Sequence, residues 1–384
     1  MFKRGLTCLF YTGPLDSIST GGEYYDMDIT DYFDESVHRD WQRRTEGTVR
    51  VAMVGLGWWT RDHAIPAVED TDLCETTVLV SSSSEKARDI ASVHDTIQSC
   101  LSYDEFERGV AVDEYDAVYI CTPNALHLNS ASAAARHGKH ILCEKPMEAT
   151  VDRAREMVER ARSNEVKLMI AYRMQTEPAI RRARELVSDG FIGDPLHVHG
   201  HMSQILLDMI PDPDQWRLAP DLVGPGTSVP DLGIYPINTT RFIIDDDPIS
   251  ASAMMLSESE GFEDVPDERA GFVLSFSNGC LATMSASQNA YRSSHLKAIG
   301  SEGEVSIEPG YTNSPETTLK ISRDGTDAEV SLPTVNQMEE EFDYFADRIL
   351  GDRSIHPDGD HGLVDMRTID AIFESAETGM RTPI

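Results

Sequence analysis

The sequence predicts an α/β fold with two parts: a doubly wound parallel sheet, and an α+β part with an open, mainly antiparallel sheet. Short apolar strands alternate with helical segments over residues 49–171, which is the pattern of a parallel sheet. Longer alternating runs joined by hairpin turns follow over residues 196–307, which is typical of antiparallel strands. The chain of 384 residues is long enough for two domains, at roughly 150 residues each.

The first part, residues 48–172, is predicted to contain five strands separated by helical segments. Each strand is a short apolar run that ends at a turn, as buried parallel strands do. The fourth places Glu144 and Lys145 at the carboxyl edge of the sheet, where ligands bind. The predicted strands are Val49–Val54, Thr76–Val80, Asp116–Cys121, His140–Cys143 and Lys167–Ala171, and the last predicted helix of this part is Asp152–Ser163.

The second part, residues 173–384, combines helices with longer strands. Glycine-containing turns at 277–279 and 301–303 predict antiparallel neighbours. Helices are expected on one face of this sheet, so the other face is a candidate interface between copies of the chain. The predicted helices are Glu177–Ser188, Glu339–Ile349 and Leu363–Thr378, and the predicted strands are Leu196–Leu206, Ile249–Leu256, Ala270–Ser277, Gly279–Ser287, His295–Ile299 and Gly303–Ile307.

Residues 1–47 are predicted to form an N-terminal arm outside either core. The segment mixes glycine and acidic residues with aromatic ones such as Tyr32 and Phe33, and a short helix is predicted near 35–43. Free tails seldom carry so many aromatic side chains. We therefore expect the arm to dock on another surface.

The charge balance excludes two classes of partner. The chain has 66 acidic and 33 basic residues, for a net charge of −33, and such a surface repels nucleic acid and anionic membranes. Only 7 of the 33 basic residues are lysine. A carboxylate-rich, lysine-poor chain suits a cytosol at molar salt, where the Debye length is about 3 Å and self-repulsion is screened. We expect a halophilic protein.

The cysteines indicate a reducing compartment. The chain has six cysteines, which are scattered along the sequence without a C-x-x-C pair or a histidine at metal-ligand spacing. Neither a disulfide framework nor a metal site is therefore predicted. No secretory signal is recognised at the start of the chain, and no apolar run approaches the roughly 18 residues of a membrane span. The expected location is the cytoplasm.

The turn after the first strand predicts a dinucleotide site. Gly55 and Gly57 permit a tight turn and let backbone N–H groups approach a pyrophosphate at the following helix. Thr60 stands at the third small position of the motif, where glycine is usual. Trp58 and Trp59 lie in the same turn and are assigned to cofactor binding with it.

The end of the second strand favours NADP over NAD. An acidic residue there would bind the ribose 2′-hydroxyl and repel a 2′-phosphate, but this chain has Ser81, Ser82 and Ser83 with Lys86 nearby. Hydroxyl groups and an ammonium suit a phosphate. Glu85 weakens the argument, and NAD remains the alternative.

Other polar residues are expected around the nicotinamide and the substrate. Thr122, Pro123, Asn124 and His127 follow the third strand, and His127 is given a lining role only. Glu144 and Arg173 are likewise assigned to the cofactor side. Pro146 is predicted to direct Lys145, with a cis peptide bond as one way of doing so.

A second constellation lies in the second part of the chain. If a helix begins near Asp231, then Asp231 and Tyr235 are four residues apart and share a face. A carboxylate beside a phenol could orient substrate hydroxyls. A phenol with the ordinary pKa near 10 is a poor base unless a cation favours the phenolate, and Lys145 could supply that cation. Taken alone, the pair is better explained as a helix cap and a core tyrosine.

Five motifs in one order resemble the glucose–fructose oxidoreductase / inositol dehydrogenase / rhizopine catabolism (Gfo/Idh/MocA) family, and its glucose–fructose oxidoreductase-like branch in particular. The resemblance covers roughly residues 48–380. Tyrosine at position 235 is typical of this branch, whereas many other members have histidine there. The motifs are Gly55-Leu56-Gly57, Asp116–His127, Gly138–Met147, Asp214–Arg217 and Asp231–Tyr235.

The resemblance implies a Rossmann domain, a nicotinamide cofactor and redox chemistry at a sugar carbon. It implies that Lys145 is the catalytic lysine and Tyr235 its proton-transfer partner, with Asp231 beside them. It also matches Ser81 and Lys86 to contacts with a 2′-phosphate, and it suggests a dimer or tetramer.

The expected activity is NADP-dependent oxidation of an aldopyranose, with D-xylose as the first candidate, at C1 to the lactone. Tyr235 or Lys145 would accept the proton, while Trp216, Arg217 and Arg173 would help Asp231 to hold the sugar. Two alternatives stay open: a non-catalytic sugar or nucleotide sensor on the same fold, and an NAD-dependent glycoside hydrolase. No residue distinguishes a pentose from a hexose.

Overall fold

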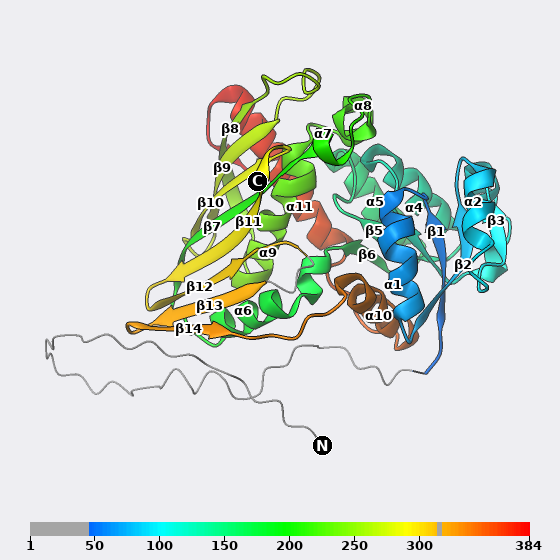
Figure 1. Ribbon diagram of the computed structural model, residues 1–384, viewed down its shortest axis with the longest axis horizontal. Coiled ribbons are helices and arrows are strands. Elements are labelled where there is room, and N and C mark those ends of the chain that lie inside the picture. Colours follow the sequence, from blue (N-terminus) through cyan, green and yellow to red (C-terminus); the bar gives the residue numbers. More distant parts are fainter. Residues whose placement is uncertain (1–45, 313–316) are drawn as a thin grey trace, which may run out of the picture.

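The computed structural model describes residues 46–312 and 317–384, which form two sheets side by side (Figure 1). The first sheet has six strands in the order β3-β2-β1-β4-β5-β6, and the second has nine in the order β14-β13-β12-β11-β7-β10-β9-β8-β15. The first is parallel throughout, and the second is antiparallel apart from the β7–β10 pair. The predicted fold class is confirmed.

The parallel sheet contains all five predicted strands and one that was missed. Strand β3 has only three residues, two of them Ser99 and Cys100, so it lacks the apolar run that identified the others. It lies at the edge beside β2. The strands are β1 (Val49–Val54), β2 (Cys74–Val80), β3 (Ser99–Leu101), β4 (Ala117–Ile120), β5 (His140–Glu144) and β6 (Leu168–Ala171).

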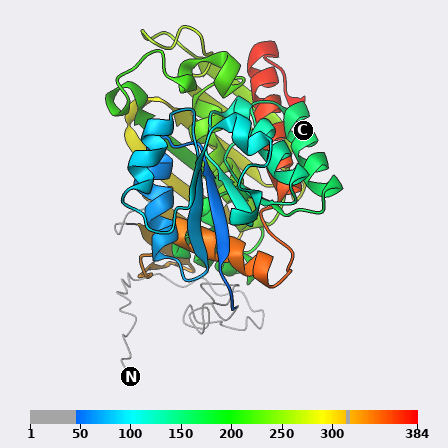
Figure 2. The ribbon, with the colours of Figure 1, turned by 90° about the vertical axis from the view of Figure 1, so that its right-hand side faces the viewer.

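Helices cover both faces of the parallel sheet (Figure 2). One face packs against α10 (Gln337–Leu350), which comes from the far end of the chain and buries Phe342 and Phe345 against β1 and β2. The chain therefore returns to its first sheet after β14 and then adds the last strand, β15, to the second sheet. The other helices of this part are α1 (Ile65–Asp70), α2 (Ser84–Ala91), α3 (Tyr103–Glu107), α4 (His127–Arg136) and α5 (Val151–Ser163).

The nine-stranded sheet contains the six predicted strands and three that were missed. The predicted hairpins are confirmed, because β9 pairs antiparallel with β10 and β11 with β12. The missed strands are β13 (Thr318–Arg323), β14 (Thr326–Val330) and β15 (Thr382–Pro383), and the others are β7 (Pro195–Ile205), β8 (Pro248–Leu256), β9 (Arg269–Phe276), β10 (Leu281–Ser287), β11 (Asn289–Gly300) and β12 (Gly303–Glu308).

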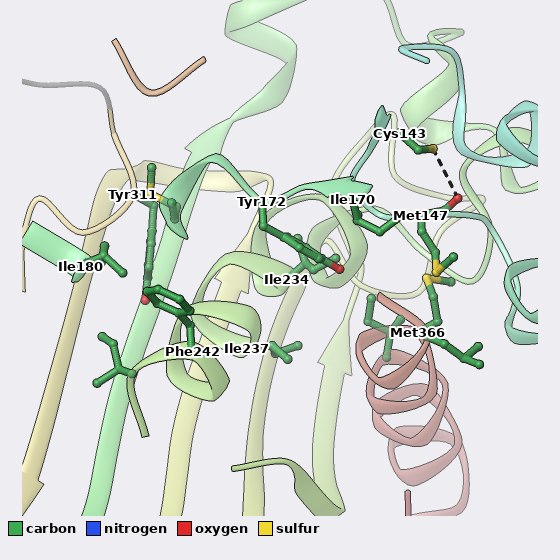
Figure 3. Close-up of a cluster of buried hydrophobic side chains, with 14 of the residues drawn as sticks. Cys143, Met147, Ile170, Tyr172, Ile180, Ile234, Ile237, Phe242, Tyr311 and Met366 are labelled. Atoms are coloured by element: carbon green, nitrogen blue, oxygen red, sulfur yellow. Dashed lines mark hydrogen bonds between the residues drawn. The ribbon is translucent and has the colours of Figure 1, made fainter. Parts of the chain in front are cut away.

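Helices α6 (Pro178–Ser188), α9 (Ile234–Ile244) and α11 (Gly359–Thr378) pack on one face of this sheet, between it and the parallel sheet (Figure 1). A continuous core joins the two sheets through these helices (Figure 3). Cys143 and Ile170 from β5 and β6 meet Ile234 of α9 and Met366 of α11 in this core. This packing fixes the start of α9 near the carboxyl ends of β5 and β6.

Within residues 46–312 and 317–384, no helix is long and apolar enough to cross a membrane. Residues 1–45 of the predicted arm, with its short helix near 35–43, lie outside the described residues. The domain limits at 47/48 and 172/173 stay predictions.

Candidate active site

The fourth predicted strand, β5, delivers Lys145 to the carboxyl edge of the parallel sheet. The strand ends at Glu144, and the Lys145–Pro146 peptide bond that follows is cis, as the sequence suggested. The Lys145 side chain is only 11% exposed. Its ammonium therefore lies in the interior, between the two parts of the molecule.

Lys145 is bound to Asp231 from the second part of the chain. Its Nζ donates to Asp231 Oδ1 at 3.0 Å and to the Asp231 carbonyl oxygen at 2.9 Å. Burial alone would lower the pKa of Lys145, but the charge of Asp231, together with Tyr235, Glu144 and the hydrogen bond to Asp231, outweighs burial and holds that pKa above its ordinary value. Lys145 is therefore a protonated cation at neutral pH.

The other carboxylate oxygen of Asp231 is also occupied. Arg217 Nε donates to Oδ2 at 3.3 Å and Gln288 Nε2 donates to it at 2.8 Å. Burial would raise the pKa of Asp231, but the charges of Lys145 and Arg217 outweigh it and hold that pKa well below the usual range. Asp231 is a fixed, ionised acceptor.

Tyr235 stands one turn after Asp231, as the sequence spacing predicted. Asp231 lies in the π-helical turn η7 (Val229–Gly233), which continues directly into α9. Lys145 Nζ lies 4.6 Å from the centre of the Tyr235 ring. Arg173 Nη2 donates to the phenol oxygen at 3.3 Å. The phenol is thus in contact with two cations, and the one bonded to its oxygen is Arg173.

Arg173 reaches Tyr235 from the first turn after β6. Its guanidinium also donates to the carbonyl oxygen of Tyr311 at 3.1 Å and to the Gln337 side chain of α10. It lies 5.8 Å from the Trp59 ring. The sequence assigned Arg173 to the cofactor and substrate, and the structure places it between Trp59 and Tyr235.

Glu144, predicted to contact the cofactor, is held by neighbouring side chains. Its Oε1 accepts hydrogen bonds from Tyr119 Oη at 2.6 Å and from Trp59 Nε1 at 3.1 Å. Its Oε2 accepts the backbone N–H of Lys145 at 3.2 Å. In this arrangement the carboxylate ties Trp59, in the turn after β1, to the end of β5.

The glycine turn fits a pyrophosphate. Gly55 has φ +95°, and a Cβ there would lie 2.3 Å from the Cys121 carbonyl oxygen, so only glycine is accommodated. A Cβ on Gly57 would meet nothing within 4 Å, which leaves open space beside the helix N-terminus for a ligand. Thr60 is buried and donates to the Gly55 carbonyl oxygen at 2.7 Å, so it closes the turn where the motif usually has glycine.

The serine-rich loop lies at the end of β2, separated from β5 by β1 and β4 in the sheet. Ser81 Oγ accepts the N–H of Ser83, and Ser83 Oγ caps α2 by accepting the N–H of Lys86. Ser82 and Lys86 are exposed. Within the described residues, no hydrogen bond or ion pair holds the Lys86 ammonium. It is available to an anion.

The polar groups of the turn after β4 are buried, and two of its residues bind carbonyl oxygens of the chain. The Thr122 hydroxyl is buried and has no hydrogen-bond partner among the described residues. Asn124 instead donates its amide to the Val223 carbonyl oxygen at 2.9 Å. His127 is 1% exposed, and its ring nitrogens face the carbonyl oxygens of Thr122 and Met147. It packs beneath the turn, which Pro123 begins.

Trp216 and Arg217 belong to a small substructure beside Asp231. It comprises α7 (Leu206–Met209), the 3-10 turn η6 (Trp216–Leu218) and α8 (Pro220–Val223), seen at the top of Figure 1. A hydrophobic cluster of its own, which includes Leu218 and Phe262, holds it together. Arg217 stacks on Trp216 with its Cζ 4.5 Å from the ring. The indole and guanidinium thus sit next to the Asp231 carboxylate.

Three residues of this site escaped the sequence analysis. Gln288 contacts Asp231, while Tyr119 and Gln337 hold Glu144 and Arg173. Tyr119 lies in a strand read only for its apolar character, and the glutamines stand outside any motif. Their roles depend on contacts between residues 25 to 164 positions apart.

Comparison with known proteins identifies related chains for both parts. Residues 49–172 match the family described as "Oxidoreductase family, NAD-binding Rossmann fold" (GFO/IDH/MocA), and residues 180–306 match the "GFO/IDH/MocA C-terminal domain". The chain is 51% identical to the D-xylose 1-dehydrogenase [NADP(+)] of Haloarcula marismortui, over 88% of this chain and 95% of that protein.

More distant relatives also act on sugars, by their names. The chain is 29% identical to the 1,5-anhydro-D-fructose reductase of Ensifer adhaerens, over 87% of this chain and 98% of that protein. A solved structure of the aldose–aldose oxidoreductase of Caulobacter crescentus in complex with glycerol superposes with a TM-score of 0.82 at 29% identity, covering 88% of this chain and all of that one.

Proposed function

Because this chain belongs to the GFO/IDH/MocA family of oxidoreductases, we propose that it is an NADP-dependent sugar dehydrogenase that oxidises D-xylose at C1 to the lactone. The observation that carries the proposal is the joint placement of Lys145, Asp231 and Tyr235 at the carboxyl end of β5. The name of the Haloarcula marismortui relative supports both the sugar and the cofactor.

The cofactor would lie along the carboxyl edge of the parallel sheet. Gly55, Gly57 and the helix after them would hold the pyrophosphate, and Ser81 and Lys86 would hold the 2′-phosphate. Thr122 follows β4, which lies between β1 and β5 in the sheet, and the Trp59 indole is bonded to Glu144 at the end of β5, so both residues suit the nicotinamide end. Once bound, a nicotinamide supplies the hydride acceptor, which no side chain can supply.

Tyr235 is the proposed proton acceptor for the anomeric hydroxyl. Lys145 is held protonated by Asp231, so it has no free lone pair with which to take a proton. To accept a proton, Tyr235 has to be in its phenolate form, and the negative charge of that oxygen faces Arg173 at 3.3 Å and the Lys145 ammonium over the ring. Cations fixed in a buried site before the reaction stabilise such charge strongly, because no water has to reorient.

Asp231, Trp216 and Arg217 are proposed to orient the sugar. Three donors already occupy the Asp231 carboxylate, and a carboxylate offers about four acceptor positions. One position therefore remains for a sugar hydroxyl. The Trp216 ring offers a flat apolar surface for a pyranose, and Arg217 ties that surface to Asp231.

A panel of aldoses with NAD and with NADP, at molar salt, tests the proposal. We expect reduction of NADP with D-xylose and slower reduction with hexoses or with NAD. Purified protein that already holds cofactor and cleaves glycosides without net reduction would indicate the hydrolase alternative. Binding of sugar without any redox reaction would indicate the sensor alternative.

We further propose that the chain assembles as a dimer or tetramer through the face of the nine-stranded sheet opposite the helices. Large apolar side chains on its strands are exposed, including Met254 at 82% and Tyr291 at 86%. An uncovered sheet face that exposes large apolar side chains is a candidate interface. The mass of the particle in molar salt, measured by light scattering, tests this.

We also propose that the protein works in a cytoplasm with a high salt concentration. The charge of −33 and the free cysteines support this location.

A further inference from the structure

Gln288 occupies the short connection between β10 and β11, and it is completely buried. Its Nε2 donates to Asp231 Oδ2 at 2.8 Å. Its Oε1 accepts a hydrogen bond from Gln204 Nε2 at 2.9 Å. An amide whose oxygen is occupied by a donor must turn its nitrogen to the other side. Gln204 therefore fixes Gln288 with its N–H directed at the carboxylate.

The backbone of Gln288 is held as firmly as its side chain. Its N–H donates to Ser228 Oγ at 2.9 Å and to the Glu268 carbonyl oxygen at 3.1 Å. Its carbonyl oxygen accepts the N–H of Leu206 at 2.8 Å. Ser228 immediately precedes the turn η7 that carries Asp231. One residue thus binds both the turn and its carboxylate.

We propose that Gln288 is a positioning residue of the reaction, which acts through Asp231; this rests on the function proposed above. With Gln288 and Arg217 on Oδ2, the carboxylate presents Oδ1 to Lys145. An amide N–H can only donate, so Gln288 favours the ionised form of Asp231. The ionised form in turn keeps Lys145 charged beneath the Tyr235 ring.

The first test removes the hydrogen bond while keeping a side chain of similar length. We expect Gln288→Met to lower kcat about 10-fold, the scale of a hydrogen bond to a charged group, with the KM for NADP unchanged. The same change at Gln98, an exposed residue that precedes β3, should leave both constants as they are. An unchanged kcat in Gln288→Met would overturn the proposal.

A double-mutant cycle with Asp231→Ala shows whether Gln288 acts through Asp231. We expect Gln288→Met to have little further effect on kcat once the carboxylate is gone. Two independent effects that multiply would assign Gln288 a general structural role and overturn the proposal. Absence of sugar oxidation in the wild-type chain would overturn the proposed function instead. In that case the same double-mutant cycle is measured by thermal unfolding. Shifts in Tm that are additive in the double variant would show that Gln288 and Asp231 are not coupled, and would overturn the proposal.

Gln288→Glu supplies a signature that a merely structural residue would not give. In this variant a second carboxylate lies beside that of Asp231, and the two negative charges repel each other. When the pH falls, such a pair takes up one proton that both carboxylates share. The protonated pair regains a donor toward Asp231, so the kcat of this variant, relative to wild type, should rise as the pH falls. Gln98→Glu adds the same charge elsewhere and should follow the wild-type profile. A constant ratio of Gln288→Glu to wild type across the pH range would overturn the proposal.

Discussion

The two ends of the proposed cofactor site are built in opposite ways. At the Lys145 end, four charged side chains (Lys145, Arg173, Arg217 and Asp231) are mostly shielded from solvent, and each is paired with another group of the site. At the Ser81 end, the Lys86 ammonium is exposed and carries no ion pair within the described residues. The serine hydroxyls there accept hydrogen bonds from the loop backbone and keep their own protons to donate.

This difference follows from what each end has to do. Groups that stabilise charge during a reaction are most effective when they are fixed beforehand in a site that excludes water. Groups that select one cofactor from another need only contact the bound phosphate, and they lose little by remaining in water until then. Changes at the first end should therefore act on kcat, and changes at the second end on the KM for the cofactor.

The largest effect is expected from Lys145→Ala. This change removes the cation at the Tyr235 ring and, within the described residues, leaves Arg217 as the one charged partner of Asp231. Loss of a group that assists proton transfer lowers rates by at least about 10²-fold. We expect that loss in kcat, measured with D-xylose and NADP at molar salt. Lys320→Ala, at an exposed position on β13, controls for the removal of a lysine. Turnover near the wild-type level in Lys145→Ala would contradict the assignment.

A smaller effect, on a different constant, is expected from Lys86→Ala. A hydrogen bond to a charged group contributes about 1.5–3 kcal/mol, so the KM for NADP should rise about 10-fold or more while kcat at saturation stays the same. The KM for NAD, which lacks the 2′-phosphate, is the internal control and should not change. An equal rise for both cofactors would assign Lys86 to the common part of the dinucleotide and remove the contrast between the two ends.

The fold class and the candidate residues Lys145, Asp231 and Tyr235 could be predicted from the sequence. Strand–helix alternation predicts the parallel sheet, and the resemblance carried by the motifs singles out the three residues, whose catalytic roles stay predictions. Strands such as β3 and β15 were missed because two or three residues form no pattern.

Contacts of the site residues could not be predicted in the same way. The Arg173–Tyr235 bond and the Gln288–Asp231 bond join residues 62 and 57 positions apart. They exist because α9 packs between the two sheets, and no local pattern encodes that packing. The partners of Asn124 and His127, the carbonyl oxygens of Val223 and Thr122, were not predicted either, and the expected places of both residues beside the cofactor stay predictions.

The third prediction concerns stability and the residue that holds the Lys145 end in place, Asp267. Asp267 is fully buried, and its carboxylate accepts the N–H groups of Thr227 at 2.7 Å and Val229 at 2.8 Å, at the start of the turn that carries Asp231. A Cβ on Gly226 would lie 2.2 Å from Asp267 Oδ1. Burial outweighs these hydrogen bonds and raises the pKa of Asp267 from 3.8 to about 6.

The sign of the stability effect follows from that shift. Between pH 3.8 and about 6 the folded chain binds a proton at Asp267 more tightly than the unfolded chain does, so the contribution of this group to stability falls as the pH rises. Relative to Asp267→Asn, the free energy of unfolding of the wild type should drop by about 1 kcal/mol from pH 5 to pH 7. Denaturant titrations at both pH values in molar salt measure it.

The next residue, Glu268, provides a control, because its pKa is lowered where that of Asp267 is raised. Burial would raise the pKa of Glu268, but hydrogen bonds from residues such as Ser259 and Asn289 lower it to about 2. Its contribution to stability is therefore present above pH 4.5 and is lost only as the pH falls toward 2. The difference between wild type and Glu268→Gln should be almost the same at pH 5 and pH 7. If the difference between wild type and Asp267→Asn is also almost the same at pH 5 and pH 7, then ionisation of the buried Asp267 carboxylate does not destabilise the fold. The contrast between the buried Lys145 end and the exposed Lys86 loop would then be weaker than proposed.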